Sequence, residues 1–304
     1  MSLLPFRAPR GAAVEPRPVA IVLSGGGSAG AAQAGMLAAL MAGGTRPDFI
    51  VGCSVGALNG TFLAIDPTAG RAAALVELWR GLTPRDVFGS SAVRRVVNLL
   101  TRRDHLCSPD ALRRLVRSWM PIADLADTEI PMHVITTDLH TGQPAWWSAG
   151  DTETLLAASA CLPGVFPPVA LGGSRHVDGG VSDAVPVERA VELGARTIWL
   201  LDVTSDDPLP VGRRMSALDV LLRSFTISRT ARRANGTVAH EGVTVHHLRV
   251  PACAGLDPRD FSRSAALLDA GYTTAKAFVD ALAAVPVPEQ RSRLRRRLRP
   301  VPAA

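Results

Sequence analysis

Short apolar runs alternate with Ala- and Leu-rich stretches along most of this chain of 304 residues. Residues 19–23, Val-Ala-Ile-Val-Leu, form an uninterrupted apolar run, which is typical of a strand buried on both faces of a parallel sheet. A stretch rich in Ala, Leu and Met follows from Ala31 to Met41 and predicts a helix. Residues 49–51 predict the next strand, and the mostly apolar stretch from Val55 to Ile65 predicts the next helix. Strands that alternate with helices favour one three-layer α/β/α domain with a mainly parallel central sheet.

Later segments extend this pattern. Residues 174–177 and 243–250 predict two further short strands, and Trp146-Trp147 lies in another, where we expect core packing. Residues 71–125 are the expected insertion, with short helices predicted at 72–79, 91–100 and 109–119. The sequence leaves open whether these helices cover a pocket as a lid or pack on the surface.

Ser54 lies at the centre of a G-x-S-x-G motif formed by residues 52–56. This spacing is typical of a tight strand-to-helix turn that exposes a serine hydroxyl, because Gly52 and Gly56 have no side chains to collide across the bend. The same five residues also arise by chance in Gly- and Ala-rich chains, so the plain alternative is an ordinary strand–turn–helix corner. Ser54 is therefore a candidate nucleophile whose assignment depends on the surrounding motifs.

A glycine loop, Ser-Gly-Gly-Gly-Ser-Ala-Gly at residues 24–30, joins the first predicted strand to the first helix. Gly25, Gly27 and Gly30 satisfy the G-x-G-x-x-G pattern of dinucleotide-binding proteins. That function needs an acid at the end of the second strand, whereas the nearest acid here, Asp48, lies at the other end of that strand. Nucleotide binding is therefore the weaker interpretation.

The glycine loop has a second chemical use. Successive glycine N–H groups at a helix N-terminus form a nest for negative charge, which suits a phosphate or the oxyanion of an acyl-transfer intermediate. Because the ends of neighbouring parallel strands lie at one edge of a sheet, the loop and Ser54 are expected to face each other. The sequence thus places an anion nest beside the candidate nucleophile.

A serine nucleophile needs a base, and two arrangements remain open. His246 or His247 fits the Ser-acid-His order of α/β-hydrolases, but both lie in a strand-like run rather than a loop. Asp178 is followed by Gly179 and Gly180, so nothing bulky stands beside its carboxylate, although Asp-Gly is also a common turn sequence. A free aspartate has a pKa of about 3.9 and is a weak base at neutral pH, but burial against apolar neighbours would raise the pKa and strengthen proton abstraction.

In this order and at these separations, the motifs resemble the patatin-like phospholipases. The resemblance extends to Thr-Thr-Asp-Leu-His-Thr-Gly at residues 136–142 and to residues 158–169 and 177–186. It covers roughly residues 17–282. We therefore expect a flexible N-terminus at residues 1–16, a patatin-like acyl-hydrolase domain at 17–284 and a Pro/Arg-rich tail at 285–304.

The resemblance implies that Ser54 is the nucleophile and that Asp178 is its only side-chain partner, in a Ser-Asp catalytic dyad. It implies a lipid acyl ester as the substrate, an acyl-enzyme intermediate, and no metal or organic cofactor. Many relatives carry Lys or Arg in the glycine loop where this chain has Ala29, which weakens the expectation that the loop grips a phospholipid headgroup. The oxyanion hole is assigned by resemblance to the backbone of Gly25, Gly26, Gly27 and Ser28.

Two alternatives to a patatin-like acyl hydrolase stay open. One is a Ser-His-Asp esterase of the α/β-hydrolase type, and the other is a non-catalytic lipid- or partner-binding protein of the same fold. The cysteines, which are Cys53, Cys107, Cys161 and Cys253, show neither metal-ligand nor redox spacing and are expected to be free thiols. Prolines interrupt the only apolar run near the N-terminus, and no apolar segment of about 18 residues is present, so we expect a cytoplasmic protein.

The net charge of +6 belongs to the C-terminal tail. Residues 291–304 hold six arginines and no acid, so that of 33 basic residues 27 remain in residues 1–290, against 27 acids. A solvated end is the default interpretation, and our hypothesis is weak, salt-sensitive peripheral contact with an anionic membrane, without nucleic acid. The six residues concerned are Arg291, Arg293, Arg295, Arg296, Arg297 and Arg299.

Overall fold

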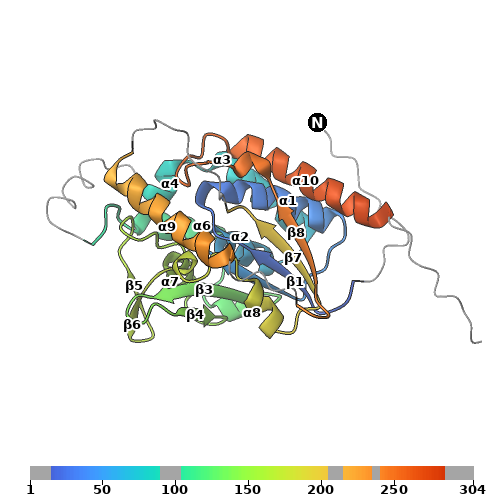
Figure 1. Ribbon diagram of the computed structural model, residues 1–304, viewed down its shortest axis with the longest axis horizontal. Coiled ribbons are helices and arrows are strands. Elements are labelled where there is room, and N and C mark those ends of the chain that lie inside the picture. Colours follow the sequence, from blue (N-terminus) through green and yellow to red (C-terminus); the bar gives the residue numbers. More distant parts are fainter. Residues whose placement is uncertain (1–14, 90–103, 205–214, 235–239, 285–304) are drawn as a thin grey trace, which may run out of the picture.

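An eight-stranded sheet forms the centre of the computed structural model, which describes residues 15–89, 104–204, 215–234 and 240–284 (Figure 1). The strands are β1 (Val19–Leu23), β2 (Phe49–Cys53), β3 (Met132–Asp138), β4 (Pro144–Trp147), β5 (Val169–Leu171), β6 (Ser174–Asp178), β7 (Thr197–Asp202) and β8 (Thr244–Arg249). The helices are α1 (Gly30–Ala42), α2 (Val55–Ala64), α3 (Ala69–Gly81), α4 (Pro84–Phe88), α6 (Asp110–Trp119), α7 (Thr152–Ser159), α8 (Val187–Glu192), α9 (Ala217–Ala234) and α10 (Ser264–Ala284).

The sheet is mainly parallel. Strands β3, β2, β1, β7 and β8 are neighbours in that order and run parallel, whereas β4 and β6 pair antiparallel with β3, and β5 pairs antiparallel with β6. Helical crossovers are required between parallel strands, and α1 provides the first of them, between β1 and β2. The α/β fold class predicted from the sequence is confirmed by this arrangement.

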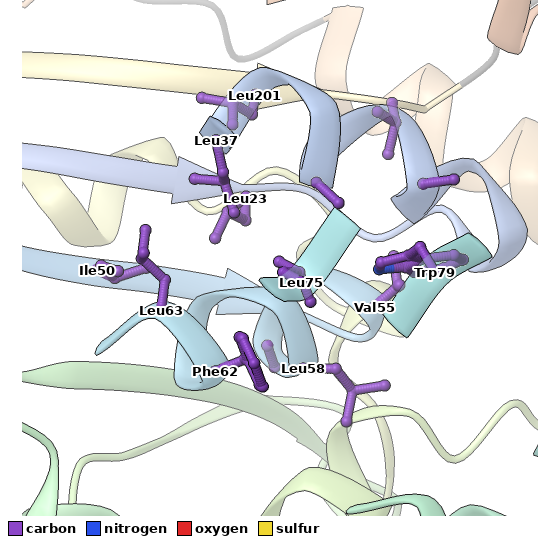
Figure 2. Packing of buried hydrophobic residues seen from close by; sticks show 14 of the residues in the cluster. Leu23, Leu37, Ile50, Val55, Leu58, Phe62, Leu63, Leu75, Trp79 and Leu201 are labelled. Atoms are coloured by element: carbon purple, nitrogen blue, oxygen red, sulfur yellow. The ribbon is translucent and has the colours of Figure 1, made fainter. Parts of the chain in front are cut away.

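Strand β1 separates two layers of core side chains. Val19, Ile21 and Leu23 pack in the larger layer, beneath α1, α2, α3 and α10. Ala20 and Val22 face the opposite side, where they pack in a smaller layer that includes Ala190 of α8. Figure 2 shows Leu23 beside Leu37 and Leu201 in the larger layer. Both faces of β1 are covered, which explains why its sequence is apolar without alternation.

The predicted insertion at residues 71–125 contributes to the larger core layer. Helix α3 corresponds to the helix predicted at 72–79, and its Leu75 and Trp79 are almost completely buried (Figure 2). Helix α6 corresponds to the helix predicted at 109–119, whereas the one predicted at 91–100 lies outside the described residues. No described residue of this insertion lines the pocket that contains Ser54.

Two expectations from the sequence are peripheral membrane contact through the arginine tail and free thiols at the four cysteines. None of the described helices combines the length and the apolarity needed to cross a bilayer. The arginine tail lies outside the described residues, as do residues 1–14. All four cysteines are buried, and within the described part of the chain none forms a disulfide.

Candidate active site

The turn between β2 and α2 places Ser54 in an unusual backbone conformation. Its φ of 54° and ψ of −122° make it the one residue other than glycine with positive φ in the described part of the chain. A Cβ atom at Gly56 would lie 2.4 Å from the carbonyl oxygen of Leu23, and a Cβ at Gly52 would lie 2.6 Å from that of Gly56. Only glycine fits these two close approaches, so the G-x-S-x-G spacing is a steric requirement of this turn. The positive φ of Ser54 is a strained backbone conformation, and such strain is typical of functional sites.

Ser54 and Asp178 form a direct hydrogen bond. The Ser54 hydroxyl donates to Oδ2 of Asp178 with 2.7 Å between the oxygens, and the two residues are 8% and 2% exposed. The second carboxylate oxygen, Oδ1, accepts a hydrogen bond of 2.8 Å from the amide of Gly180. Thr137 fixes the backbone next to it by donating its hydroxyl to the Asp178 carbonyl at 2.9 Å. The carboxylate is therefore held with one oxygen turned toward the serine.

The register of β3 explains why these two residues meet. Residues 134–135 of β3 pair with both β4 and β2, and residues 136–137 pair with both β4 and β6. Because a strand has only two edges, β2 and β6 must lie end to end along the same edge of β3. Cys53 is the partner of Ile135 and Asp178 is the partner of Thr136, so the two strands converge on adjacent positions from opposite directions.

Two of the four glycine-loop amides, those of Gly25 and Ser28, already donate hydrogen bonds within the protein. The Gly25 amide donates to the carbonyl oxygen of Ala184 at 2.9 Å, and the Ser28 amide donates to that of Pro258 at 2.9 Å. A donor that is engaged in this way is not available to an oxyanion. The four residues assigned by resemblance to the oxyanion hole therefore divide into two occupied donors and two remaining ones.

The remaining donors are the amides of Gly26 and Gly27. Within the part of the chain that the structure describes, neither amide makes a hydrogen bond, and both residues line the same pocket as Ser54. The amide of Ser54 itself donates to Oγ of Ser159 at 3.0 Å. Ser159 was not singled out from the sequence, although it lies in the Ala-Ser-Ala-Cys segment that contributed to the resemblance.

A buried polar network supports the glycine loop from beneath. Gln33 donates through Nε2 to the carbonyl oxygens of Ser24 and Leu201, at 2.8 and 3.1 Å. Asn59 donates through Nδ2 to Oε1 of Gln33 at 3.1 Å and accepts at Oδ1 from the indole N–H of Trp79 at 2.9 Å. These hydrogen bonds tie the start of the loop to β7, α2 and α3, so the loop rests on the fully buried interior.

The two histidines of the alternative triad lie elsewhere. Strand β8 is three strands away from β2 in the order β2-β1-β7-β8, which corresponds to about 14 Å. His247 pairs through Nε2 with Oδ2 of Asp202 at 2.9 Å, and the His246 ring lies 4.4 Å from the Trp199 ring, where burial lowers its pKa. Neither histidine lines the pocket of Ser54, so this geometry gives no support to the triad.

The pocket around Ser54 has an apolar part and a charged part. Gly26, Gly27, Ser54 and Asp178 form its reactive end. The apolar wall includes Leu162, Val203, Phe225 and Leu256, and the charged wall includes Asp219, Arg223, Asp257 and Arg259. Apart from Leu162, the residues of these two walls come from segments in which the sequence shows no chemical motif.

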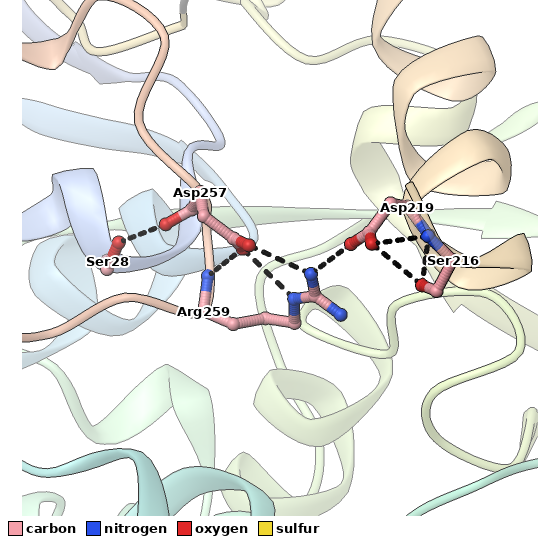
Figure 3. Close-up of polar contacts among 5 residues, drawn as sticks. All are labelled: Ser28, Ser216, Asp219, Asp257 and Arg259. Carbon is pink, nitrogen blue, oxygen red and sulfur yellow. Dashed lines mark hydrogen bonds and ion pairs between the residues drawn. The ribbon is translucent and has the colours of Figure 1, made fainter. Parts of the chain in front are cut away.

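Arg259 joins α9 to the segment that contacts the glycine loop. Its guanidinium pairs with the carboxylates of Asp257, at 2.8 Å, and of Asp219 on α9 (Figure 3). The carbonyl oxygen of Asp257 accepts from the Ser28 hydroxyl at 3.0 Å. We call Asp257, Arg259 and Asp219 the arginine clamp. It connects the candidate oxyanion hole to α9 through side chains that are mostly shielded from solvent.

Hydrogen bonding favours the charged forms of Asp219 and Arg259 in the clamp. The amide and hydroxyl of Ser216 both donate to Oδ2 of Asp219, at 2.8 and 2.7 Å. Together with Arg259, these donors lower the pKa of Asp219 to about 2. The hydrogen bonds to Asp257 and Asp219 raise the pKa of Arg259 in turn. Both partners are therefore charged throughout the neutral pH range.

Comparison with known proteins adds independent information. The family model described as patatin-like phospholipase matches residues 21–191. Lysophospholipase nte1 of Aspergillus terreus is 31% identical over 205 residues, which are 64% of this chain and 12% of that protein. Patatin-like phospholipase domain-containing protein 7 of Mus musculus is 28% identical over 192 residues, covering 62% of this chain and 14% of that protein. The chain thus spans only a small part of the length of these curated relatives.

The fold has a counterpart among solved structures. VipD of Legionella pneumophila superposes with a TM-score of 0.53 at 14% identity, covering 88% of this chain and 67% of that one. This similarity concerns the fold alone. The family match, however, covers 171 of 304 residues and includes the glycine loop, Ser54 and Asp178. The chain belongs to the patatin-like phospholipase family.

Proposed function

We propose that this protein hydrolyses a carboxylic ester bond of a phospholipid or lysophospholipid, with Ser54 as nucleophile and Asp178 as general base. The observation that carries the proposal is the buried hydrogen bond of 2.7 Å between the Ser54 hydroxyl and the Asp178 carboxylate. Family membership and relatives named lysophospholipases support the choice of substrate class.

The first half of the reaction forms an acyl-enzyme. Asp178 accepts the hydroxyl proton at Oδ2 while Oγ of Ser54 attacks the ester carbonyl carbon. The carbonyl oxygen becomes an oxyanion, to which the amides of Gly26 and Gly27 would donate. When the tetrahedral intermediate collapses, the bond between carbon and the alcohol oxygen breaks, and Asp178 returns the proton to the leaving alcohol. The alcohol product is the lipid that has lost one acyl chain.

The second half of the reaction regenerates the enzyme. A water molecule attacks the acyl carbon and gives a proton to Asp178, and the same amides stabilise the second oxyanion. The bond between carbon and Oγ then breaks, Ser54 takes the proton back, and a fatty acid is released. The carboxylate thus acts alternately as base and acid, so no third side chain is required.

The two parts of the pocket suit an amphipathic substrate. Leu162, Val203 and Phe225 offer apolar contacts to an acyl chain. The charged wall combines two arginines with two aspartates, so it offers polar contacts without a net charge. This lining supports a lipid ester with a polar headgroup over a wholly apolar ester.

The test compares two variants with a matched control. Ser54→Ala and Asp178→Asn should each lower kcat for a short-chain ester by at least about 10³-fold, with unchanged melting temperature. The double variant His246→Ala, His247→Ala should keep kcat within about threefold, because both rings lie outside the pocket. Loss of activity in the histidine variant, with retention in Asp178→Asn, would instead support the Ser-His-Asp alternative.

Two further measurements address the substrate and the non-catalytic alternative. A fluorophosphonate probe should label wild-type protein at Ser54 and fail to label Ser54→Ala. Absence of labelling in the folded wild type would favour a lipid-binding protein without turnover. Mass spectrometry of a mixed phospholipid and lysophospholipid extract should then show free fatty acids with wild type and none above background with Ser54→Ala.

A further inference from the structure

Among the described side chains of helix α9, three aliphatic ones are exposed, while two charged ones are half-buried. Val220, Leu221 and Ile227 are 51%, 50% and 55% exposed. Its charged residues Asp219 and Arg223 are instead half-buried and line the pocket. A helix on the surface of a globular protein normally buries its apolar stripe and exposes its charges.

The exposed residues form one continuous face. Val220, Ser224 and Ile227 follow the i, i+4, i+7 spacing of a single helical stripe, and Leu221 and Ser228 form the stripe next to it. These five are the exposed residues within the described part of α9, and none of them is charged. We call them the outer face of α9. Exposed aliphatic side chains that lie next to one another are typical of an interaction surface, whereas isolated ones are ordinary.

The charge of the helix indicates which partner the outer face would contact. The α9 sequence contains Arg223, Arg229, Arg232 and Arg233 but only one acid, Asp219, a net charge of +3 from four positive and one negative residue. Net positive charge combined with an apolar, uncharged face is the composition of helices that lie in the interface of anionic membranes.

The outer face is linked to the candidate active site. Asp219, Arg223 and Thr226 of the same helix line the pocket that contains Ser54. The arginine clamp holds α9 to the segment that contacts Ser28 in the glycine loop (Figure 3). A membrane that touched the outer face would therefore lie against the wall of the pocket, within reach of a lipid leaving the bilayer.

We propose that the outer face of α9 docks on an anionic lipid surface and positions the pocket beside it. The proposal rests on the proposed function for the identity of the substrate, whereas the docking itself is measured without turnover. Val220, Leu221 and Ile227 enter the interfacial region, and the net positive charge of the α9 sequence attracts the helix to the anionic surface.

The experiment measures vesicle binding in the full chain with Ser54→Ala as background, so that hydrolysis cannot alter the lipid. The test variant adds Leu221→Gln and Ile227→Gln, neither of which lines the pocket. The matched control adds Val245→Gln and Leu282→Gln, which are 40% and 39% exposed on β8 and at the end of α10. Binding is measured by co-sedimentation with vesicles of phosphatidylcholine alone and of phosphatidylcholine mixed with phosphatidylglycerol, at low and at high salt.

The background protein should bind the mixed vesicles more tightly than the neutral ones. The test variant should bind the mixed vesicles at least about tenfold more weakly at both salt concentrations, because apolar insertion persists when charges are screened. The control should bind like the background. With Ser54 restored, the test variant should keep wild-type kcat on a soluble short-chain ester, which separates docking from catalysis.

Three outcomes would overturn the proposal. They are equal binding by the test variant and the background, equal loss in the test and control variants, and a dimer in solution that the test variant converts to monomer. If the wild type bound vesicles as expected but hydrolysed no ester, the proposed function would fail while docking stood.

Discussion

The backbone amide of Ser28 donates a hydrogen bond to the carbonyl oxygen of Pro258, with 2.9 Å between nitrogen and oxygen. The same oxygen would lie 2.5 Å from a Cβ atom placed on Gly27, whose φ is +59°. Residue 258 thus packs directly against the candidate oxyanion hole. Any side chain at position 27 must displace this segment or the glycine loop.

We therefore expect Gly27→Ala to reduce catalysis through geometry. The added methyl group would move the two amides that remain to bind an oxyanion, and loss of one such donor typically costs 10²- to 10³-fold in kcat, about 2.7–4 kcal/mol. The kcat for a short-chain ester should fall by about that factor, with a smaller change in KM. Steady-state kinetics on protein of verified melting temperature provide the measurement.

Gly44→Ala is the matched control for backbone strain. Gly44 also has a positive φ, of +89°, but nothing lies within 4 Å of its added Cβ. Its substitution should lower the melting temperature and leave kcat unchanged, because it strains the backbone without a clash near the site. Wild-type kcat in Gly27→Ala would contradict the assignment of the oxyanion hole to this loop.

Ser54 and Asp178 could be singled out as candidates from the sequence because part of the sterics around them is short-range. Gly52 is required by a close approach to Gly56 within a single turn, and Gly180 holds the Asp178 carboxylate from two residues away, whereas Gly56 is required by the approach of Leu23 on β1. The fold class followed from apolar runs without polar alternation, because such runs indicate strands that are buried on both faces. Such information is local, so one sequence suffices to find it.

The rest of the pocket depends on contacts between distant segments. Ser28 meets Asp257 across 229 residues, and Ser54 meets Ser159 across 105. No local motif marks Asp219 or Arg259, because each takes its role only from the packing of α9 beside the glycine loop. The sequence therefore predicted two candidate catalytic residues but not the charged wall, nor which two amides of the loop remain available.

The arginine clamp should make stability depend on pH below about pH 4. Asp219 has a pKa of about 2 in the folded protein, against about 3.9 in an unfolded chain. Because the folded pKa is lowered, its stabilising contribution is complete above about pH 4 and is lost as the pH falls toward 2. Asp219→Asn should thus melt at a lower temperature than wild type at pH 6, and the difference should shrink below pH 4.

Asp269→Asn serves as the control for this pH dependence. Its side chain is 75% exposed and lies 3.8 Å from Arg80, a geometry that contributes little to stability. Its melting temperature should follow that of wild type at every pH. A constant difference between Asp219→Asn and wild type from pH 6 to pH 2 would contradict the clamp as the source of the effect.

Cys161 should be inert even though it lies next to Asp178. Burial, reinforced by the Asp178 carboxylate, raises the pKa of its thiol to about 12, and its backbone carbonyl accepts the Asp178 amide at 2.9 Å. Iodoacetamide reacts with thiolates, so native protein at pH 8 should show no labelling of this residue and no loss of activity. Peptide mass spectrometry should find the label only after denaturation. Rapid modification of native Cys161 would contradict its placement beside the dyad.

The buried network under the glycine loop should be sensitive to loss of a single amide. Asn59→Leu keeps a similar volume but removes the acceptor of the Trp79 indole and the donor to Gln33 and to the Gly30 carbonyl. Each buried group left without a partner costs about 1–3 kcal/mol. The free energy of unfolding should fall accordingly in urea denaturation, and kcat should fall with it because Gln33 orients the start of the loop.

Thr61, two residues further along α2, provides the opposite case. Both side chains are fully buried, but the Thr61 hydroxyl has no hydrogen-bond partner among the described residues. Thr61→Val removes that hydroxyl at constant shape and should be neutral or stabilising, since a buried polar group without a partner is itself unfavourable. If both variants lowered the free energy of unfolding equally, volume and helix packing would explain the loss. A large loss confined to Asn59→Leu would instead identify the hydrogen-bond network as the support of the glycine loop.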